Sequence, residues 1–279
     1  MSAGARLLSV AERLVDACPA ELGREIAVTG SVGAGLADEL SDLELLLLVD
    51  APPEPARVTT WLESVGATDV LAGRESSGTW AWCLVDGVEV EPFWGSLQEA
   101  RRGVDAVVAA EAFGHGALAF AHVVTHSVVL RSGGELSDFE ARLGAYPEEL
   151  RRRVVEDAIA GWEIPSPRLG AAQRGDRFPV QWHLHREAER VLRVVFALNR
   201  RWEPPRWKWL AVHAAELEIV PPRLAARIVE PLVATDAVVA VHSLAELVRE
   251  TLALVSPEFD VAAARRGTER RLTVLGRVA

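Results

Sequence analysis

The sequence contains little of several residue types that mark particular classes of protein. Its 279 residues include two cysteines, Cys18 and Cys83, one methionine, one tyrosine and one lysine, Lys208, so every other basic residue is arginine. Two cysteines exclude a disulfide framework and a cysteine-based zinc cluster. No apolar run is long enough to span a bilayer, and the N-terminal residues lack the apolar core of a signal peptide. We therefore expect a soluble cytoplasmic protein that has no membrane partner.

Acidic side chains outnumber basic ones by 40 to 30, which gives a formal net charge of −10. An extended nucleic-acid surface requires clustered basic charge, so we expect none here. The hydrophobic fraction of 49% is ordinary for a globular protein, and the chain is long enough to bury one or two cores. The composition leaves the oligomeric state open.

The pattern of apolar residues changes near residue 100. Before it, the apolar run Leu43–Val49 predicts a buried strand, and Asp86-Gly87 between two β-rich runs predicts a hairpin. After it, helical periodicity predicts helices over 104–130, 135–143, 147–162, 178–200, 206–217, 222–233 and 237–255. We expect a mixed α/β part over residues 1–103 and a helical part over 104–279. A loop is expected over 164–176, and the last 15 residues are expected to be loosely held.

Chemistry is concentrated between Val28 and Asp50. A short strand leads into Gly30 and Ser31, and Asp42 and Glu44 lie at the start of the next strand. Side chains two positions apart on a strand share a face, so these two carboxylates are expected side by side. Neighbouring carboxylates repel unless a cation lies between them, and hard oxygen ligands favour Mg²⁺. Gly30 allows close approach of a ligand, and Ser31 offers a hydroxyl and an N–H to phosphate.

Gly30-Ser31, with Gly35, followed by Ser41-Asp42-x-Glu44, resembles the nucleotidyltransferase (DNA polymerase β-like) superfamily. The resemblance implies a nucleotidyltransferase-fold mixed β-sheet with helices, followed by a C-terminal helical bundle. It also implies a third carboxylate on a neighbouring strand, for which Glu89 and Glu91 are the candidates. Glu91 matches the pattern of a carboxylate after a valine better, although Pro92 is unusual in a central strand.

A second match to the superfamily lies downstream, in Arg193–Trp209. This segment is similar to one in a bacterial branch near the aminoglycoside adenylyltransferases, and it contains Lys208. A lysine kept where arginine is used everywhere else suits a compact, flexible ammonium group. The resemblance implies that Lys208 contacts the phosphates of a nucleotide.

The resemblance implies an Mg²⁺-dependent enzyme of the nucleotidyltransferase type that transfers a nucleoside monophosphate, AMP from ATP, to a hydroxyl of a small-molecule acceptor. Asp42, Glu44 and Glu91 would hold metal, Glu91 or Glu89 would act as catalytic carboxylate, and Gly30, Ser31 and Lys208 would bind the nucleotide. An aminoglycoside-like acceptor is one option. Two alternatives stay open, namely a protein-AMPylating enzyme of the toxin–antitoxin type and a catalytically silent nucleotide-binding protein.

Histidines and tryptophans supply weaker signals. His115, His122 and His126 have spacings that can place them on one helical face, and in their apolar setting we expect no nearby acidic ligand. We interpret them as core or interface residues rather than zinc ligands. Trp80 and Trp82 share a strand face and are candidates for lining a substrate cleft, whereas the tryptophans at 202, 207 and 209 are assigned to packing.

Overall fold

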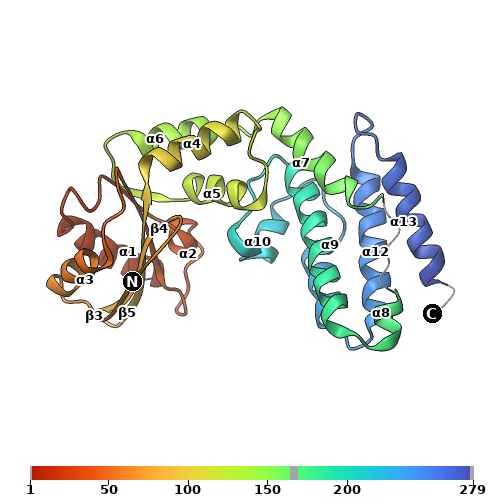
Figure 1. The fold of residues 1–279 in the computed structure, drawn as a ribbon, viewed down its shortest axis with the longest axis horizontal. Coiled ribbons are helices and arrows are strands. Elements are labelled where there is room, and N and C mark those ends of the chain that lie inside the picture. The colour runs from red at the N-terminus through yellow and green to blue at the C-terminus, as the bar shows by residue number, and fades with distance from the viewer. Residues whose placement is uncertain (1, 164–168, 277–279) are drawn as a thin grey trace. The chain divides into compact units, whose positions relative to one another are not determined.

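The computed structural model describes residues 2–163 and 169–276, and its contacts divide the chain into two units. The sheet unit comprises Met1–Ala112 and Ala119–Ala145, and the helical unit comprises Phe113–Leu118 and Tyr146–Ala279 (Figure 1). The functional assignment of residues 1–103 and 104–279 stays a prediction.

The elements of the sheet unit are α1 (Ala3–Asp16), β1 (Glu25–Val28), α2 (Gly30–Gly33), β2 (Leu43–Val49), α3 (Pro55–Ser64), β3 (Thr68–Glu75), β4 (Gly78–Val85), β5 (Val88–Ser96), α4 (Leu97–Val108), β6 (Val128–Arg131) and α6 (Glu135–Leu143). Helix α5 (His115–Thr125) contributes residues to both units. The helical unit contains α7 (Glu148–Ala160), α8 (Leu169–Arg174), α9 (Arg177–Leu198), the 3₁₀ turn η1 (Pro205–Trp207), α10 (Leu210–Ala215), α11 (Leu224–Val233), α12 (Ala237–Leu254) and α13 (Ala262–Leu275).

Six strands form one mixed sheet in the order β3-β4-β5-β2-β1-β6. Strands β2 and β5 are parallel, and every other neighbouring pair is antiparallel. The predicted hairpin is confirmed, since Asp86 and Gly87 connect β4 to β5 with φ angles of 52° and 74°. Two successive positive φ angles are typical of the tight turn that follows the twist of a hairpin.

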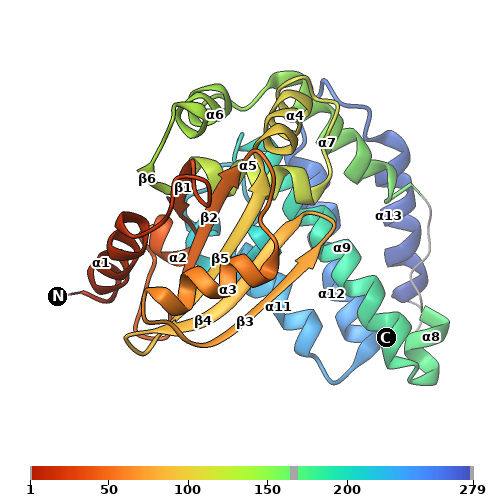
Figure 2. The same ribbon diagram turned by 60° about the vertical axis from the view of Figure 1, so that its left-hand side comes forward.

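One face of the sheet packs on α1 and α3. The alternate residues Leu43, Leu45, Leu47 and Val49 of β2 belong to a buried core with apolar side chains of both helices. Figure 2 shows α3 lying across the strands. Because side chains alternate along a strand, the residues between these positions, including Glu44, project from the opposite face.

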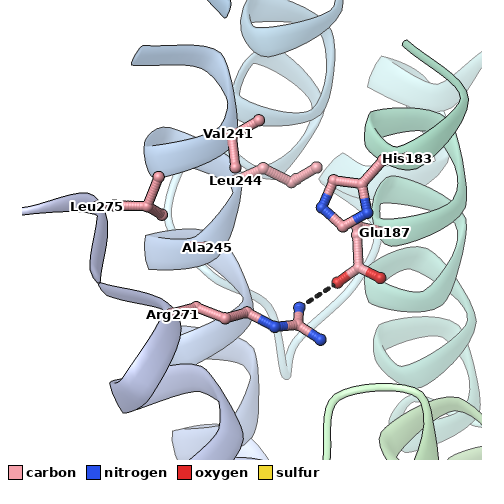
Figure 3. Close-up of a pocket in the computed structure, with 7 residues that line it drawn as sticks. All are labelled: His183, Glu187, Val241, Leu244, Ala245, Arg271 and Leu275. Carbon is pink, nitrogen blue, oxygen red and sulfur yellow. Dashed lines mark hydrogen bonds and ion pairs between the residues drawn. The ribbon is translucent and has the colours of Figure 1, made fainter. Parts of the chain in front are cut away.

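The helical unit is built around α9, which contacts α7 and α12, while α12 in turn contacts α11 and α13. A buried ion pair links α9 to α13, because Arg271 Nη1 donates to Glu187 Oε2 at 2.7 Å and both side chains are at most 5% exposed. Figure 3 shows this pair beside His183 in a small pocket that apolar side chains of α12 help to line. Within the described ranges, no helix is both long and apolar enough to cross a membrane.

Some of the sequence-based expectations for the regular structure are wrong in part. The helix expected over 104–130 is replaced by two helices and the strand β6, which pairs with β1. In the loop expected over 164–176, residues 169–174 form α8, and 164–168 lie outside the described residues. The C-terminal segment expected to be loose forms α13 over Ala262–Leu275.

Candidate active site

The strand register brings two predicted carboxylates together. In the parallel pairing of β2 with β5, Glu44 is the direct partner of Glu91. Asp42 immediately precedes β2, and one carboxylate oxygen from each of the three residues lies within 4.8 Å of the others. All three are half-buried. We call Asp42, Glu44 and Glu91 the acidic cluster, and among the described residues it is the one group arranged so that it can hold a metal ion.

Gly30 lies directly against this acidic cluster. Its φ angle is +61°, and a Cβ atom added there would lie 2.1 Å from Glu44 Oε2. The preceding residue, Thr29, donates its backbone N–H to the carbonyl oxygen of Glu44 at 3.0 Å. Glycine is therefore required at position 30 for two reasons. The backbone there is left-handed, and the Glu44 carboxylate occupies the space that a side chain would fill. Ser31 follows in the single turn α2 and is half-buried.

Glu89 and Glu91 lie on the same face of β5 but in different surroundings. Glu91 belongs to the acidic cluster, whereas Glu89 is exposed and accepts a hydrogen bond from Trp82 Nε1. Pro92 lies in a central strand, as its pairing with Leu45 shows. On its other side, β5 pairs with β4 in two stretches, and Pro92 lies between them without a partner. The stretches are Phe93–Gly95 with Gly78–Trp80 and Val88–Val90 with Cys83–Val85. The missing N–H of proline thus falls in a gap of the ladder.

Aromatic side chains extend this face of the sheet beyond the acidic cluster. Trp80 and Trp82 on β4 and Phe93 on β5 project from the same side as Glu91, and Trp80 is 39% exposed. A Cβ added to Gly73 on β3 would lie 2.5 Å from the Trp80 ring, so the indole lies over the backbone of the neighbouring strand. The face therefore combines exposed aromatic surface with carboxylates.

Lys208 belongs to the helical unit and is exposed. The helix expected over 206–217 is shorter in the structure, with only η1 at its start and α10 over Leu210–Ala215. Around Lys208, the residues Arg206, Trp207 and Trp209 have φ angles of 52°, 54° and 57°. Each left-handed residue other than glycine costs about 1 kcal/mol or more. This segment is therefore held by its surroundings and not by helix propensity.

The three histidines have distinct environments. His122 is buried, His126 is exposed, and their rings stack with centroids 4.0 Å apart. His115 lies in the helical unit, where its Nδ1 is 2.7 Å from Glu203 Oε2. The expectation that no acidic group lies near these histidines is thus wrong for His115. The partner is 88 residues away in the chain, so no local spacing indicates it.

Both cysteines are buried and reduced. Burial raises the pKa of the Cys18 thiol and of the Cys83 thiol from 9.0 to about 11. Because the thiolate is the nucleophilic form, neither residue has the properties of a catalytic cysteine near neutral pH.

Comparisons with known proteins give a matching family model and similar solved structures. A family model described as a domain of unknown function (DUF4037) matches residues 117–210. The chain is also similar to a solved structure of a nucleotidyltransferase-like protein from Exiguobacterium sibiricum 255-15. The identity is 15% and the TM-score 0.39, over 90% of this chain and 75% of that chain. No curated protein matches the sequence. At that identity and TM-score the likeness says nothing about chemistry.

Proposed function

We propose that the protein is an Mg²⁺-dependent nucleotidyltransferase that transfers AMP from ATP to a hydroxyl group of a small-molecule acceptor. The observation that carries the proposal is the contact between Gly30 and the Glu44 carboxylate within the acidic cluster. This contact puts a glycine-rich turn, able to approach phosphates, beside a group of oxygen ligands suited to a divalent cation.

The charge of the acidic cluster supports a cation at this position. Two unit charges 4.8 Å apart repel by about 3.5 kcal/mol at an effective dielectric constant of ~20. The actual repulsion is smaller than this value, because the side chains are only half-buried and water screens their charges. Three such carboxylates destabilise the fold unless a cation or protons compensate them. Asp42, Glu44 and Glu91 would hold Mg²⁺, which supplies positive charge to the phosphates of the nucleotide.

The chain's own residues have the following roles in the proposed reaction. Gly30 and Ser31 bind the β- and γ-phosphates through backbone N–H groups and the Ser31 hydroxyl. The acceptor oxygen forms a bond to the α-phosphorus, the bond from that phosphorus to the bridging oxygen of the β-phosphate breaks, and pyrophosphate leaves. Glu91 accepts the proton from the acceptor hydroxyl, with Glu89 as the alternative base. Lys208 contributes positive charge toward the leaving pyrophosphate.

The assay is pyrophosphate release from ATP with a panel of hydroxyl-bearing acceptors, including aminoglycosides, in the presence and absence of Mg²⁺. Asp42→Asn is expected to lower release at least about 100-fold and to remove Mg²⁺-dependent ATP binding measured by calorimetry. Asp50→Asn is the matched control, since it makes the same charge change just after the opposite end of β2, at an exposed residue paired with Arg24. Equal binding in Asp42→Asn and wild type would refute the metal assignment.

Lys208 is tested by Lys208→Met, which keeps an unbranched apolar stem without the charge, beside Lys208→Arg. We expect both to fold, and we expect ATP affinity or turnover to fall most in Lys208→Met because it removes the charge. Unchanged binding and turnover in Lys208→Met would remove this residue from the proposal.

The same assays separate the alternatives. Mass gain of a co-purified protein, with no release on any small acceptor, supports a protein-AMPylating enzyme. ATP binding that depends on Mg²⁺, without pyrophosphate release on any acceptor, supports a silent nucleotide-binding protein. The branch near the aminoglycoside adenylyltransferases stays a prediction that acceptor specificity would test.

A further inference from the structure

The strand register places a tryptophan directly beside the acidic cluster. Both stretches of the β4–β5 pairing keep one register, and that register sets Trp82 opposite Glu91. Glu91 pairs with Glu44 on its other side, and Trp82 pairs with Leu71 on β3. One row across the sheet therefore runs from Leu71 through Trp82 and Glu91 to Glu44, on the four neighbouring strands β3, β4, β5 and β2 (Figure 2). Neighbouring strands lie about 4.8 Å apart, so Trp82 is one such spacing from a proposed metal ligand.

A carboxylate fixes the orientation of the Trp82 ring. The Nε1–H of Trp82 donates to Glu89 Oε1, and Glu89 lies two residues before Glu91 on β5. Glu89 is exposed, whereas Trp82 is half-buried. Because an indole has a single hydrogen-bond donor, this bond determines the direction in which the ring lies relative to β5. Trp82 thus offers an oriented aromatic surface beside the acidic cluster.

The side chains next to Trp82 on β3 and β4 are apolar and partly open to solvent. Leu71, its partner on β3, is 60% exposed, and Trp80, two residues earlier on β4, is 39% exposed. The Trp80 indole lies over Gly73 of β3 and so leans away from β5. Leu84, two residues after Trp82, is half-buried. Adjoining exposed apolar side chains of this size, with a few polar groups at their border, are typical of a ligand-binding surface.

The chemistry of this surface favours one class of acceptor. A flat ring gains free energy by stacking on an indole, whereas each ammonium group of a polycation needs a carboxylate beside it. Outside the acidic cluster, Glu89 is the one carboxylate among the described positions that adjoin Trp82 on this face, and it already accepts the Trp82 N–H. A ring that lies on Trp82 also brings a hydroxyl on its substituent toward Glu91, one strand spacing away. The surface therefore suits an aromatic alcohol better than a polyamine.

We propose that Leu71, Trp80, Trp82 and Glu89 form the acceptor subsite, and that the acceptor is an aromatic alcohol whose ring stacks on Trp82. Its role as acceptor rests on the proposed function. Leu71 and Trp82 contact the ring, and Trp80 extends the apolar surface toward β3. Glu89 is a positioning residue that acts through Trp82. This assignment leaves Glu91 as the carboxylate that accepts the proton from the acceptor hydroxyl.

The test uses 2-naphthalenemethanol, a neutral aromatic alcohol, as the probe, and it follows the indole N–H signals of the full chain by NMR without ATP or Mg²⁺. We expect the probe to shift the signals of Trp80 and Trp82 and to leave unmoved that of Trp182, an exposed tryptophan of the helical unit. Unmoved signals of Trp80 and Trp82 would overturn the inference. Tighter binding of kanamycin at the same two indoles would overturn the aromatic class of acceptor. Because neither nucleotide nor metal is present, these results are separate from failure of nucleotidyl transfer.

Substitution of the tryptophans tests the stacking contact. Trp82→Leu is expected to lower the affinity for the probe at least about 5-fold, because it removes the aromatic surface. Trp182→Leu is the matched control and is expected to keep wild-type affinity. Trp80→Leu, at a more exposed position, serves if Trp82→Leu does not fold, and it is expected to lower the affinity about 2-fold. Wild-type affinity in Trp82→Leu, or in Trp80→Leu if only that variant folds, would overturn the inference.

Two substitutions of Glu89 test its positioning role. Glu89→Gln keeps an oxygen that can accept the Trp82 N–H, so it is expected to bind the probe with nearly wild-type affinity. Glu89→Leu removes the acceptor and releases the ring, so its affinity for the probe is expected to fall as in Trp82→Leu. A charge effect would weaken or strengthen binding equally in both variants. Equal affinities in Glu89→Gln and Glu89→Leu would therefore overturn the positioning role.

Discussion

Substitution of Gly30 by alanine is expected to disrupt the acidic cluster through a single added methyl group. The new Cβ would lie 2.1 Å from Glu44 Oε2, where real Cβ contacts essentially never fall under 3.0 Å. The carboxylate therefore has to move by at least about 0.9 Å, or the turn has to move instead. Gly35→Ala is the matched control, because Gly35 also has a positive φ angle, +71°, but no atom lies within 4 Å of its added Cβ.

The two substitutions share one energetic cost and differ in another. Alanine in a left-handed conformation costs about 1–2 kcal/mol, so both variants are expected to lose that amount of unfolding free energy. Only Gly30→Ala displaces a proposed metal ligand. Mg²⁺ tolerates little deviation from ligand distances of about 2.0–2.1 Å, and a shift of about 1 Å in a catalytic group can lower the rate about 100-fold.

Urea unfolding measures the loss of unfolding free energy that both variants share. ATP titration calorimetry with and without Mg²⁺ measures the loss of nucleotide binding expected only in Gly30→Ala. We expect Mg²⁺-dependent ATP binding to be lost in Gly30→Ala and to persist in Gly35→Ala. Equal nucleotide binding in the two variants would refute the reasoning, because it would mean that the position of the Glu44 carboxylate does not matter to the ligand.

Three further outcomes are expected elsewhere in the fold. Glu25 is fully buried and accepts hydrogen bonds from backbone N–H groups at the start of α6, so Glu25→Ala should lower the unfolding free energy by about 3 kcal/mol in urea. A loss under 0.5 kcal/mol would contradict this role. Because the pKa values of Cys18 and Cys83 rise from 9.0 to about 11 on folding, stability present below pH 9 should decline as pH approaches 11. Denaturation at pH 8 and pH 10.5 measures this, and a Cys18→Ala/Cys83→Ala variant should show a smaller decline. Arg271→Met leaves Glu187 without its buried partner on α13 and should cost about 3 kcal/mol, whereas an unchanged thermal midpoint would show that the pair contributes nothing.

Local signals in the sequence predicted strand β2 and the two carboxylates at its start. The apolar run Leu43–Val49 is β2 with the expected bounds, because a strand buried on both sides of its sheet is recognisable from composition alone. The i, i+2 spacing predicted that Asp42 and Glu44 lie side by side, and the resemblance implied a third carboxylate, with Glu91 favoured over Glu89. The strand register, in which Glu91 is the partner of Glu44, places Glu91 and not Glu89 in the acidic cluster.

Features that depend on distant partners were missed. Residues 128–130 end the stretch predicted to be helical, but they belong to β6, because the open edge of β1 supplies hydrogen-bond partners that a helix cannot use. The last 15 residues were expected to be loosely held, yet Arg271 among them has a buried partner 84 residues earlier in the chain. Left-handed residues around Lys208 replaced the start of the helix expected over 206–217, and Trp207 there packs on His115 and Phe196.

The late position of β6 has a consequence for biosynthesis. Its partner β1 ends at Val28, and Val28 pairs with Val128, so the two leave the ribosome about 100 residues apart. At a translation rate of about 5–20 residues per second, the outer edge of β1 is synthesised roughly 5–20 s before its neighbour β6. The Glu25 carboxylate is likewise synthesised well before the backbone N–H groups of Gly133 and Leu136 that donate to it. A nascent chain stalled before residue 128 therefore exposes an incomplete sheet edge, which makes this interval the one in which a chaperone would be expected to act.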